Sequence, residues 1–457
     1  GLFFNNATIN CGNPLLTGTQ AADIGCTPAD ILADNDTDLY IGRRNVEGGG
    51  RQDVLGYQSY RMVGGVRGAI NDYWSYDAYA SYSQVELSRV YENDFSASRL
   101  QRALDVVDVA GVPTCSSVVA GTDLDCVPYN PFAPGGITQA QLDYLQIPLM
   151  QNGRTVQQVV SGVVTGDLGA YGMQSPWAAR GVQVALGAEY RRDELESTSD
   201  AAFAAGDGTG QGGPTPSVSG VNDNYDLFME AQIPLAEGQA WADLMSIDLA
   251  ARYSDYEFGG EATTYKIGAD WAPIPDFRLR GSFQHAVRAP NILELFFPSG
   301  TNLFDMDFDP CDDINDDGLN NNSIPVGCIG VNPWQVTLAQ SDSGFLSSPA
   351  GQYNWITGGT STLDPEEADT YTIGVVFQPD FISGLNVSVD YYNIEVDGLI
   401  SPRNPLFVSL ACYYASNLAA CGQISRNGAG NYWTPGGEVT DLNTNIGGLT
   451  TSGVDVN

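Results

Sequence analysis

The sequence has few positively charged side chains. Its 457 residues include 19 Lys and Arg against 55 Asp and Glu, which gives a formal net charge of −36 at pH 7. Lys266 is its single lysine. A protein that binds nucleic acid needs a basic face to neutralise the phosphates, so nucleic acid is excluded as a partner.

Long hydrophobic runs are also missing. The mean hydropathy is −0.14, and no apolar run reaches the roughly 18 residues that a membrane helix needs. This does not exclude a membrane β-barrel, because its strands alternate and hide their hydrophobicity from window averages. The 53 Gly and 23 Tyr residues favour an all-β chain.

Histidine is nearly absent, since His285 is the only one. A catalytic triad would have to use it, yet neither a G-x-S-x-G motif nor a reactive cysteine partner is found. We therefore predict that the protein is not an enzyme. An initiating Met and a signal peptide are missing too, and the last residues lie in a predicted strand. We expect residues 1–457 to be an internal segment of one longer domain.

Eight cysteines fall into four local couples within polar stretches rich in Gly, Pro, Asn and Asp. Eight cysteines allow about 105 pairings, but local clustering favours the sequential one. Zinc sites are disfavoured because no CxxC motif occurs and one His cannot complete them. We predict disulfides, typical of an oxidising compartment, between Cys11 and Cys26, Cys115 and Cys126, Cys311 and Cys328, and Cys412 and Cys421.

Strand-like segments recur along the chain, joined by alternately short and long connections. Short turns are expected near 71, 173, 238, 275 and 381, and all four cysteine couples fall in the long connections. Short turns at one end and long loops at the other are typical of outer-membrane barrels. About 11 strands are predicted: 56–70, 73–87, 156–169, 181–195, 224–235, 244–258, 262–274, 277–290, 367–379, 384–400 and one from about 445.

Side chains alternate within these segments. In 264–271, Tyr265, Ile267, Ala269 and Trp271 would face lipid, opposite the polar or small residues between them. The segments 370–377 and 74–82 alternate in the same way. The strands of a soluble sandwich would alternate too, so alternation alone does not distinguish the two folds. The pattern of short and long connections favours an antiparallel transmembrane β-barrel with short periplasmic turns and long, disulfide-stapled extracellular loops.

Three stretches resemble one known family. They are ARYSDYEFGG with TTYKIGADWAPIPDFRLRGSFQHAVRAPNILELFFP (within 225–298), LDPEEADTYTIGVVFQPDFISGLNVSVDYYNIEVDGLIS (363–401) and GVQVALGAEYRRDE (181–194). The strand that ends in Arg288-Ala289-Pro290, followed by Glu294, resembles a recurring signature of the TonB-dependent receptors. The resemblance covers the predicted strands from about 55 to 400.

The resemblance implies a barrel of about 22 strands in the lipids of the Gram-negative outer membrane, filled by an N-terminal plug. It implies uptake of a nutrient ligand, such as a siderophore or an oligosaccharide, with energy from the TonB complex. The plug, the TonB box and the closing C-terminal strands are expected outside this chain. Two alternatives remain: a passive substrate-specific porin, or a surface structural or adhesive protein whose loops hold Ca²⁺. A soluble lectin-like protein ranks last.

One acidic stretch, DFDPCDDINDDGLNNN (307–322), is a candidate Ca²⁺ loop. Asp313, Asn315 and Asp317 match the opening of an EF-hand loop, but the twelfth position is Ile324 instead of Glu. A noncanonical loop would add Asp309 and Asp312. The alternative is a solvated acidic loop held by the Cys311–Cys328 disulfide. No other cofactor is expected.

Seven aromatic residues lie in the two longest C-terminal connections. Their rings could stack on a sugar or an aromatic siderophore, or could equally pack the loops together. These candidate ligand-binding residues are Trp334, Tyr353, Trp355, Tyr413, Tyr414, Tyr432 and Trp433.

Overall fold

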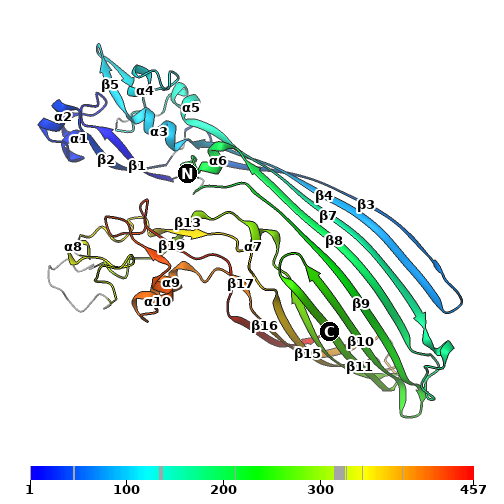
Figure 1. The fold of residues 1–457 in the computed structure, drawn as a ribbon. Coiled ribbons are helices and arrows are strands. Elements are labelled where there is room, and N and C mark those ends of the chain that lie inside the picture. The colour runs from blue at the N-terminus through cyan, green and yellow to red at the C-terminus, as the bar shows by residue number, and fades with distance from the viewer. Residues whose placement is uncertain are drawn as a thin grey trace.

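The computed structural model describes residues 2–44, 47–132, 137–210, 213–312, 325, 327–341, 343–382 and 384–457. It is dominated by an 11-stranded sheet with the order β21-β16-β15-β12-β11-β10-β9-β8-β7-β4-β3, in which neighbouring strands are antiparallel. The predicted strand number is therefore confirmed. The sheet is open, with β3 and β21 at its edges, and is not closed into a barrel (Figure 1).

The strands of this sheet differ in length. Their bounds are β3 Gln52–Ala69, β4 Trp74–Phe95, β7 Gln146–Asp167, β8 Gln183–Ser199, β9 Val218–Gln239, β10 Ala242–Tyr256, β11 Gly260–Ile274, β12 Phe277–Arg288, β15 Glu366–Phe377, β16 Val387–Asp397 and β21 Gly448–Val456. β4 continues past the predicted end at 87, and β7 begins well before the predicted 156. These additional parts, SRVYENDF and QIPLMQNGRT, do not keep a regular alternation of apolar and polar residues, so that pattern did not reveal them.

Connections at the two ends of the sheet differ, as predicted. One end carries the short turns and the connection from β7 to β8, which includes η1 (Leu168–Tyr171). The other end carries the long connections (Figure 1). The tight turn between β10 and β11 is the exception there. It uses Gly259 at φ +107° and Gly260 at φ +68°, a backbone conformation that side chains other than glycine rarely adopt.

The register places the predicted apolar residues on one face of the sheet. Ile267 lies opposite Phe283 and Leu249, and Tyr371 lies opposite Phe283 in turn. We call this side the apolar face and the other side, which includes Thr264 and Lys266, the polar face. The predicted alternation is therefore confirmed across strands.

A row of tyrosines runs across the apolar face. Tyr190 and Tyr225 have ring centroids 4.9 Å apart, and Tyr60 and Tyr82 are stacked at 6.1 Å. Between this row and the long connections the same face becomes polar. Glu194, for example, accepts a hydrogen bond there from the Arg154 guanidinium at 3.0 Å. Toward the short turns it stays apolar. The tyrosines therefore mark a boundary between an apolar belt and a hydrated zone.

The N-terminal segment and the connection from β4 to β7 form a unit that we call the first cap. Its helix α3 is capped by the Ser96 hydroxyl, which accepts from the Arg99 amide, and buries Leu100 and Leu104. The core also includes Phe95 and Leu145. The elements are β1 Leu2–Asn10, α1 Gly18–Asp23, α2 Pro28–Ala33, β2 Asp36–Arg44, α3 Ala97–Leu104, β5 Val106–Val109, β6 Val112–Cys115, α4 Ser116–Val119 and α5 Gln139–Leu145.

The connections from β12 to β15 and from β16 to β21 form the second cap (Figure 1). A four-stranded sheet, β13-β14-β19-β18, joins them, and β14 and β19 pair in parallel at Trp355 and Val439. The elements are β13 Gly300–Asp305, α8 Leu338–Ser341, β14 Gln352–Thr357, α9 Pro405–Tyr413, α10 Leu418–Cys421, β18 Ile424–Ser425 and β19 Glu438–Thr440. Short elements between sheet and caps are α6 Ala201–Ala205, α7 Ile292–Phe296, β17 Ile400–Ser401 and β20 Thr444–Asn445.

All eight cysteines form disulfides, and the four predicted pairs are confirmed. They are Cys11–Cys26, Cys115–Cys126, Cys311–Cys328 and Cys412–Cys421. The first two pairs lie in the first cap and the other two in the second. Each pair closes a short loop of its own cap, so the bonds restrain the caps and not the sheet.

Candidate functional site

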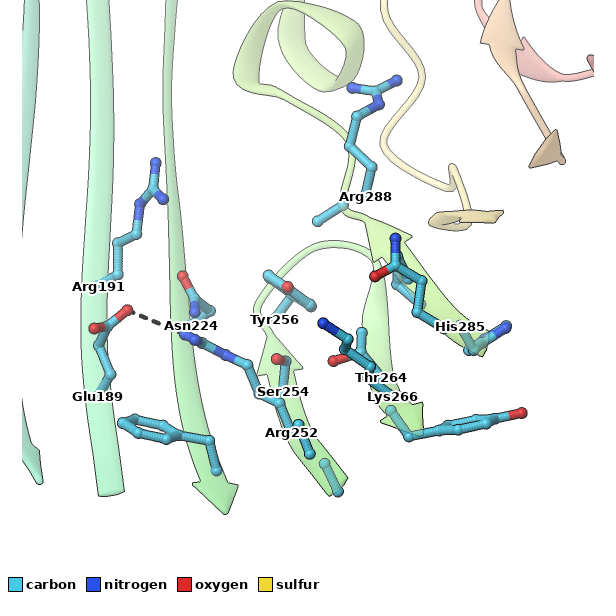
Figure 2. A pocket seen from close by; sticks show the side chains of 18 of the residues that line it. Glu189, Arg191, Asn224, Arg252, Ser254, Tyr256, Thr264, Lys266, His285 and Arg288 are labelled. Atoms are coloured by element: carbon cyan, nitrogen blue, oxygen red, sulfur yellow. Dashed lines mark hydrogen bonds and ion pairs between the residues drawn. The ribbon is translucent and has the colours of Figure 1, made fainter. Parts of the chain in front are cut away.

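A hollow of about 770 Å³ lies on the polar face, at the end of β8 to β12 near the long connections. We call it the wall hollow. Figure 2 shows labelled side chains that line it, from Glu189 and Arg191 on β8 to Arg288 on β12. The strands leave this space because small residues, such as Ala250 and Ala286, alternate with the longer ones.

The wall hollow gathers several basic side chains in a strongly acidic chain. Its lining contains four basic side chains, Arg191, Arg252, Lys266 and Arg288, in a chain of net charge −36. It contains three acidic ones, Glu189, Asp193 and Glu230. The carboxylates of Asp226, Glu294 and Glu366 also lie against two of these arginines, so the hollow as a whole is not positive.

The Arg252 guanidinium is held in place by several partners. It lies 2.7 Å from the Asp226 carboxylate and 3.1 Å from that of Glu189, and 5.5 Å from the centre of the Phe228 ring. Asp226 is buried and also accepts hydrogen bonds from Asn224, at 2.6 Å, and from the Ser254 hydroxyl. Arg252 is thus a fixed part of the wall with its charge balanced.

The Arg288-Ala289-Pro290 signature links the end of β12 to the connection that follows it. The Arg288 guanidinium lies 2.6 Å from the Glu366 carboxylate on β15 and 3.0 Å from that of Glu294 on α7. Glu294 in turn completes a capping box with Asn291. Pro290 lies against the β10–β11 turn, where a Cβ on Gly259 would be 3.0 Å from the Pro290 Cδ. With Ala289 between them, Arg288 and Pro290 fix the rim of the wall hollow.

The contacts of the His285 side chain are with neighbouring strands of the sheet. Its Nδ1 atom lies 2.8 Å from an Asp369 carboxylate oxygen, and its ring stacks on Tyr265 with centroids 5.3 Å apart. Both partners lie opposite it in the sheet. Arg278 pairs with Asp270 on the neighbouring strand β11 at 3.2 Å, and Arg280 pairs with Asp390 on β16 at 2.6 Å.

The seven aromatic candidates lie in the second cap, mostly inside it. Tyr353, Tyr413 and Tyr432 are buried in its core, and Trp334, Trp355 and Trp433 pack against that core. Tyr414, by contrast, is 60% exposed. The packing alternative thus describes the three buried tyrosines, while contact with a ligand stays a prediction for the side chains that reach the surface.

A buried ion pair organises the tyrosines. The Arg426 guanidinium donates to both Asp309 carboxylate oxygens, at 2.7 and 2.8 Å, and lies 5.3 Å from the Tyr413 ring and 4.7 Å from the Tyr432 ring. The Tyr413 hydroxyl donates to the Trp334 carbonyl at 2.6 Å. Burial raises the pKa of Tyr413 to about 12 and that of Tyr432 well above 10.

The candidate Ca²⁺ ligands are only partly described. Asp313, Asn315 and Asp317 lie outside the described residues. Both Asp309 oxygens accept from Arg426, whereas Asp312 is buried and one of its carboxylate oxygens has no hydrogen-bond partner among the described residues. No group of three or more His, Cys, Asp or Glu within that part of the chain could hold a metal ion. The Ca²⁺ loop stays a prediction.

Sequence reasoning placed Lys266 on the polar face but did not identify the wall hollow. The hollow brings together side chains of five strands, and their register depends on pairing that alternation within each strand does not reveal. None of the helices that the structure describes is long and apolar enough to cross a membrane.

A family model described as "TonB dependent receptor-like, beta-barrel" matches residues 6–457. No curated protein matches the sequence. Among solved structures, a mutant of the ferric enterobactin receptor PfeA from Pseudomonas aeruginosa in complex with enterobactin is 15% identical, with a TM-score of 0.47 over 88% of this chain and 41% of that chain.

Two further structures are similar at the same level. The siderophore receptor PirA from Acinetobacter baumannii is 12% identical, with a TM-score of 0.46 over 88% of this chain and 42% of that one. The RagAB peptide importer is 11% identical, with a TM-score of 0.42 over 89% of this chain and 34% of that one. The chain thus spans about two fifths of the length of the first of these structures.

Proposed function

Because this chain belongs to the TonB-dependent receptor-like β-barrel family, we propose that it forms part of the wall of an importer that takes up a nutrient with energy delivered through TonB. The family consists of non-enzymatic transporters of the Gram-negative outer membrane, in agreement with the prediction that the chain is not an enzyme. The observation that carries the proposal is the family match over 6–457, and the two-faced sheet fits it.

In the proposed orientation the apolar face contacts lipid and the polar face lines the lumen. On β11 the belt extends from Tyr265 to Trp271, which is about 20 Å at roughly 3.3 Å per residue. Outer-membrane barrels have an apolar band of about 25 Å with aromatic residues at both margins. Trp177 and Trp241, in contact at 6.5 Å near the short turns, fit the second margin. The caps would then be extracellular and the short turns periplasmic.

Further strands would complete the wall. β3 lies at the sheet edge, and an uncovered edge offers unpaired backbone groups to another strand. We propose that the parent protein supplies the remaining strands, the plug and the TonB box, so that residues 1–457 make up about half of a single barrel domain.

The similar structures include receptors named for enterobactin and for siderophores, and a peptide importer. Their identities to this chain are 15% or less, so they do not select one ligand. Of the seven aromatic candidates, we propose Tyr414 as a ligand contact because it is the exposed one.

Deletion of the parent gene, in cells with and without TonB, tests the proposal. We expect deletion to abolish uptake of one nutrient from a panel of ferric siderophores, oligosaccharides and peptides, and loss of TonB to abolish the same uptake. Uptake that persists without TonB would contradict the proposal and favour the passive porin. Normal uptake with loss of Ca²⁺-dependent cell aggregation would favour the adhesive protein.

A further inference from the structure

A hollow of about 550 Å³ opens on the surface of the second cap, between helix α9 and the segment that follows β13. We call it the cap hollow. Helix α9 lies beside β13 in this cap (Figure 1), and the cap hollow shares no lining residue with the wall hollow. Its lining includes Asp305, Asp307, Phe308, Leu406, Leu410 and Tyr414.

Helix α9 carries apolar side chains on both of its faces. One face packs into the core of the second cap through Val408 and Cys412. The other face carries Leu410 and, four residues later, Tyr414, and both side chains are exposed. Phe308, also exposed, lies with them in the lining of the cap hollow. An exposed apolar surface that lines a hollow is typical of a binding site.

Two carboxylates also line the cap hollow. Phe304 and Met306 are buried, so the alternation of an extended chain turns Asp305 and Asp307 outward, and both are exposed. Within the described part of the chain neither carboxylate forms an ion pair, and Asp305 accepts only a long hydrogen bond, at 3.5 Å, from the Gln352 amide. Both charges are therefore accessible to a ligand.

The basic residues of the second cap do not balance these carboxylates. The two connections that form the cap, 289–365 and 398–447, contain 12 Asp and Glu residues against two arginines. Arg426 is buried and paired with Asp309, and Arg403 does not line the cap hollow. The electrostatic potential at the hollow is therefore negative, which raises the local concentration of cations.

These side chains match the chemistry of an amine on an apolar body. An ammonium group donates three hydrogen bonds, and carboxylates accept charge-assisted hydrogen bonds from it. A cation near the Tyr414 ring gains a cation–π interaction. The apolar part of the same molecule would cover Phe308 and Leu410 and remove their surfaces from water. An anion would instead be repelled by both carboxylates.

We propose that the cap hollow binds the imported nutrient by an ammonium group carried on an apolar or aromatic body. This rests on the proposed function, because the second cap meets a nutrient only if it is the extracellular part of an importer. The ligand is then a partly apolar cation. Asp305 and Asp307 bind its charge, and Tyr414 and Leu410 bind its apolar part.

Matched probes test the preference for an amine. Phenethylamine, phenethyl alcohol and phenylpropionate present an ammonium, a hydroxyl and a carboxylate on similar apolar bodies. Their binding to the full-length parent protein in a nonionic detergent is measured by saturation-transfer NMR. We expect phenethylamine to bind about tenfold tighter than phenethyl alcohol, as for a charge-assisted hydrogen bond with a cation–π contact, and phenylpropionate to bind most weakly. Equal binding of the amine and the alcohol would overturn the proposal, as would tighter binding of phenylpropionate.

Variants test whether the amine binds in the cap hollow. Binding of phenethylamine is compared in the unmodified protein, Y414A, the double variant D305N/D307N and two matched controls. F407A removes a similarly exposed ring of α9 that does not line the hollow, and D364N removes an exposed carboxylate of the same connection. We expect Y414A and D305N/D307N each to weaken binding about three- to tenfold, and both controls to leave it unchanged. Equal weakening by Y414A and F407A, or by D305N/D307N and D364N, would contradict the proposal.

A second copy of the chain is the competing occupant of this exposed apolar surface. Sedimentation of the detergent-solubilised parent protein and of Y414A distinguishes it from a small cation. Self-association that Y414A abolishes, without binding of phenethylamine, would assign the surface to a dimer and overturn the proposal. Binding of phenethylamine to a protein that sediments as a monomer would support it.

Failure here is distinguishable from failure of the proposed function. The binding measurements need neither TonB nor an energised membrane, whereas the uptake test needs both. TonB-dependent uptake of a nutrient without binding of phenethylamine would remove only the proposed role of the cap hollow. Binding of phenethylamine without TonB-dependent uptake would remove only the energised import.

Discussion

Arg426 and Asp309 form an ion pair with two hydrogen bonds, although 117 residues separate them in the sequence. Their side chains are 2% and 0% exposed. One belongs to the connection from β16 to β21 and the other to the connection from β12 to β15. The pair therefore joins the two halves of the second cap through its core.

Removal of one charge should open this cap. The substitution R426M keeps much of the side-chain volume but leaves the Asp309 carboxylate buried without its partner, at a cost of about 3–5 kcal/mol. Hydrogen exchange should rise throughout the second cap and stay unchanged in the sheet. The control R154M breaks a pair that is 45% exposed on the arginine side and should cost about 1 kcal/mol or less. Equal effects of R426M and R154M would contradict the importance of the buried pair.

Alkaline pH should loosen the same cap. The pKa of Tyr413 is raised by burial from 10 to about 12, so between these values the unfolded cap loses a proton that the folded cap keeps. This contribution to stability is complete below pH 10 and is lost as the pH rises toward 12, by roughly 3 kcal/mol. Tyrosinate absorbance and hydrogen exchange measured together should show the loss. In Y413F the change over this range should be smaller; an unchanged profile would refute the assignment.

The disulfides should act locally. Replacing Cys311 and Cys328 by serine removes a bond with a sequence separation of 17, which should cost the second cap about 3 kcal/mol. Limited proteolysis should then cut the second cap faster and the first cap at its former rate. The matched pair is Cys115 and Cys126, whose replacement should affect the first cap instead. Destabilisation of both caps by either change would show that they are coupled.

A charge on the apolar face should hinder membrane insertion. Ile267 is 53% exposed on that face, and I267R would place a guanidinium against lipid at a cost of about 2–4 kcal/mol if it lies near the bilayer midplane. Ser282, on the polar face of the next strand, provides the control S282R. Reversible folding into lipid vesicles gives both free energies. If S282R cost as much as I267R, the assignment of the two faces would be wrong.

Removal of Ca²⁺ tests whether the acidic stretch 307–322 binds this ion. If Ca²⁺ binds there, its removal with EGTA should raise hydrogen exchange around Cys311 and Cys328. D312N should lower the affinity by about tenfold or more, because it removes a charged ligand. Substitution of Asp309 serves as a control, since loss of this carboxylate should unfold the core of the second cap even with Ca²⁺ present. No response to EGTA would reject the calcium hypothesis and leave the solvated acidic loop.

Much of the sheet could be predicted from the sequence because its signal is local. Tyr265, Ile267 and Trp271 alternate with polar residues at the period of a strand, and the turn glycines interrupt the pattern where strands end. Cys412 and Cys421 paired as predicted because they are close in the chain. The parts of β4 and β7 beyond the predicted bounds were missed because they do not keep a regular alternation of apolar and polar residues.

The second cap could not be predicted because its order is not local. The parallel contact of Trp355 with Val439 and the pairing of Asp309 with Arg426 join segments that have no shared periodicity. The wall hollow was missed for a related reason. Alternation within each strand assigned the polar residues to the correct face. Arg191 and Lys266 lie in one hollow, however, only because of the register of the strands between them.

The second cap carries its own core and two disulfides, so the sequence of this cap and the sequence of the sheet are under separate evolutionary constraints. Its core includes no residue of the 11-stranded sheet, so we expect a mutation that unfolds this cap to leave the hydrogen-bonded sheet intact. Lineages can therefore exchange or lengthen cap sequences while the strands remain recognisable. We expect homologues of this chain to diverge fastest between β12 and β15 and between β16 and β21, and slowest along the belt.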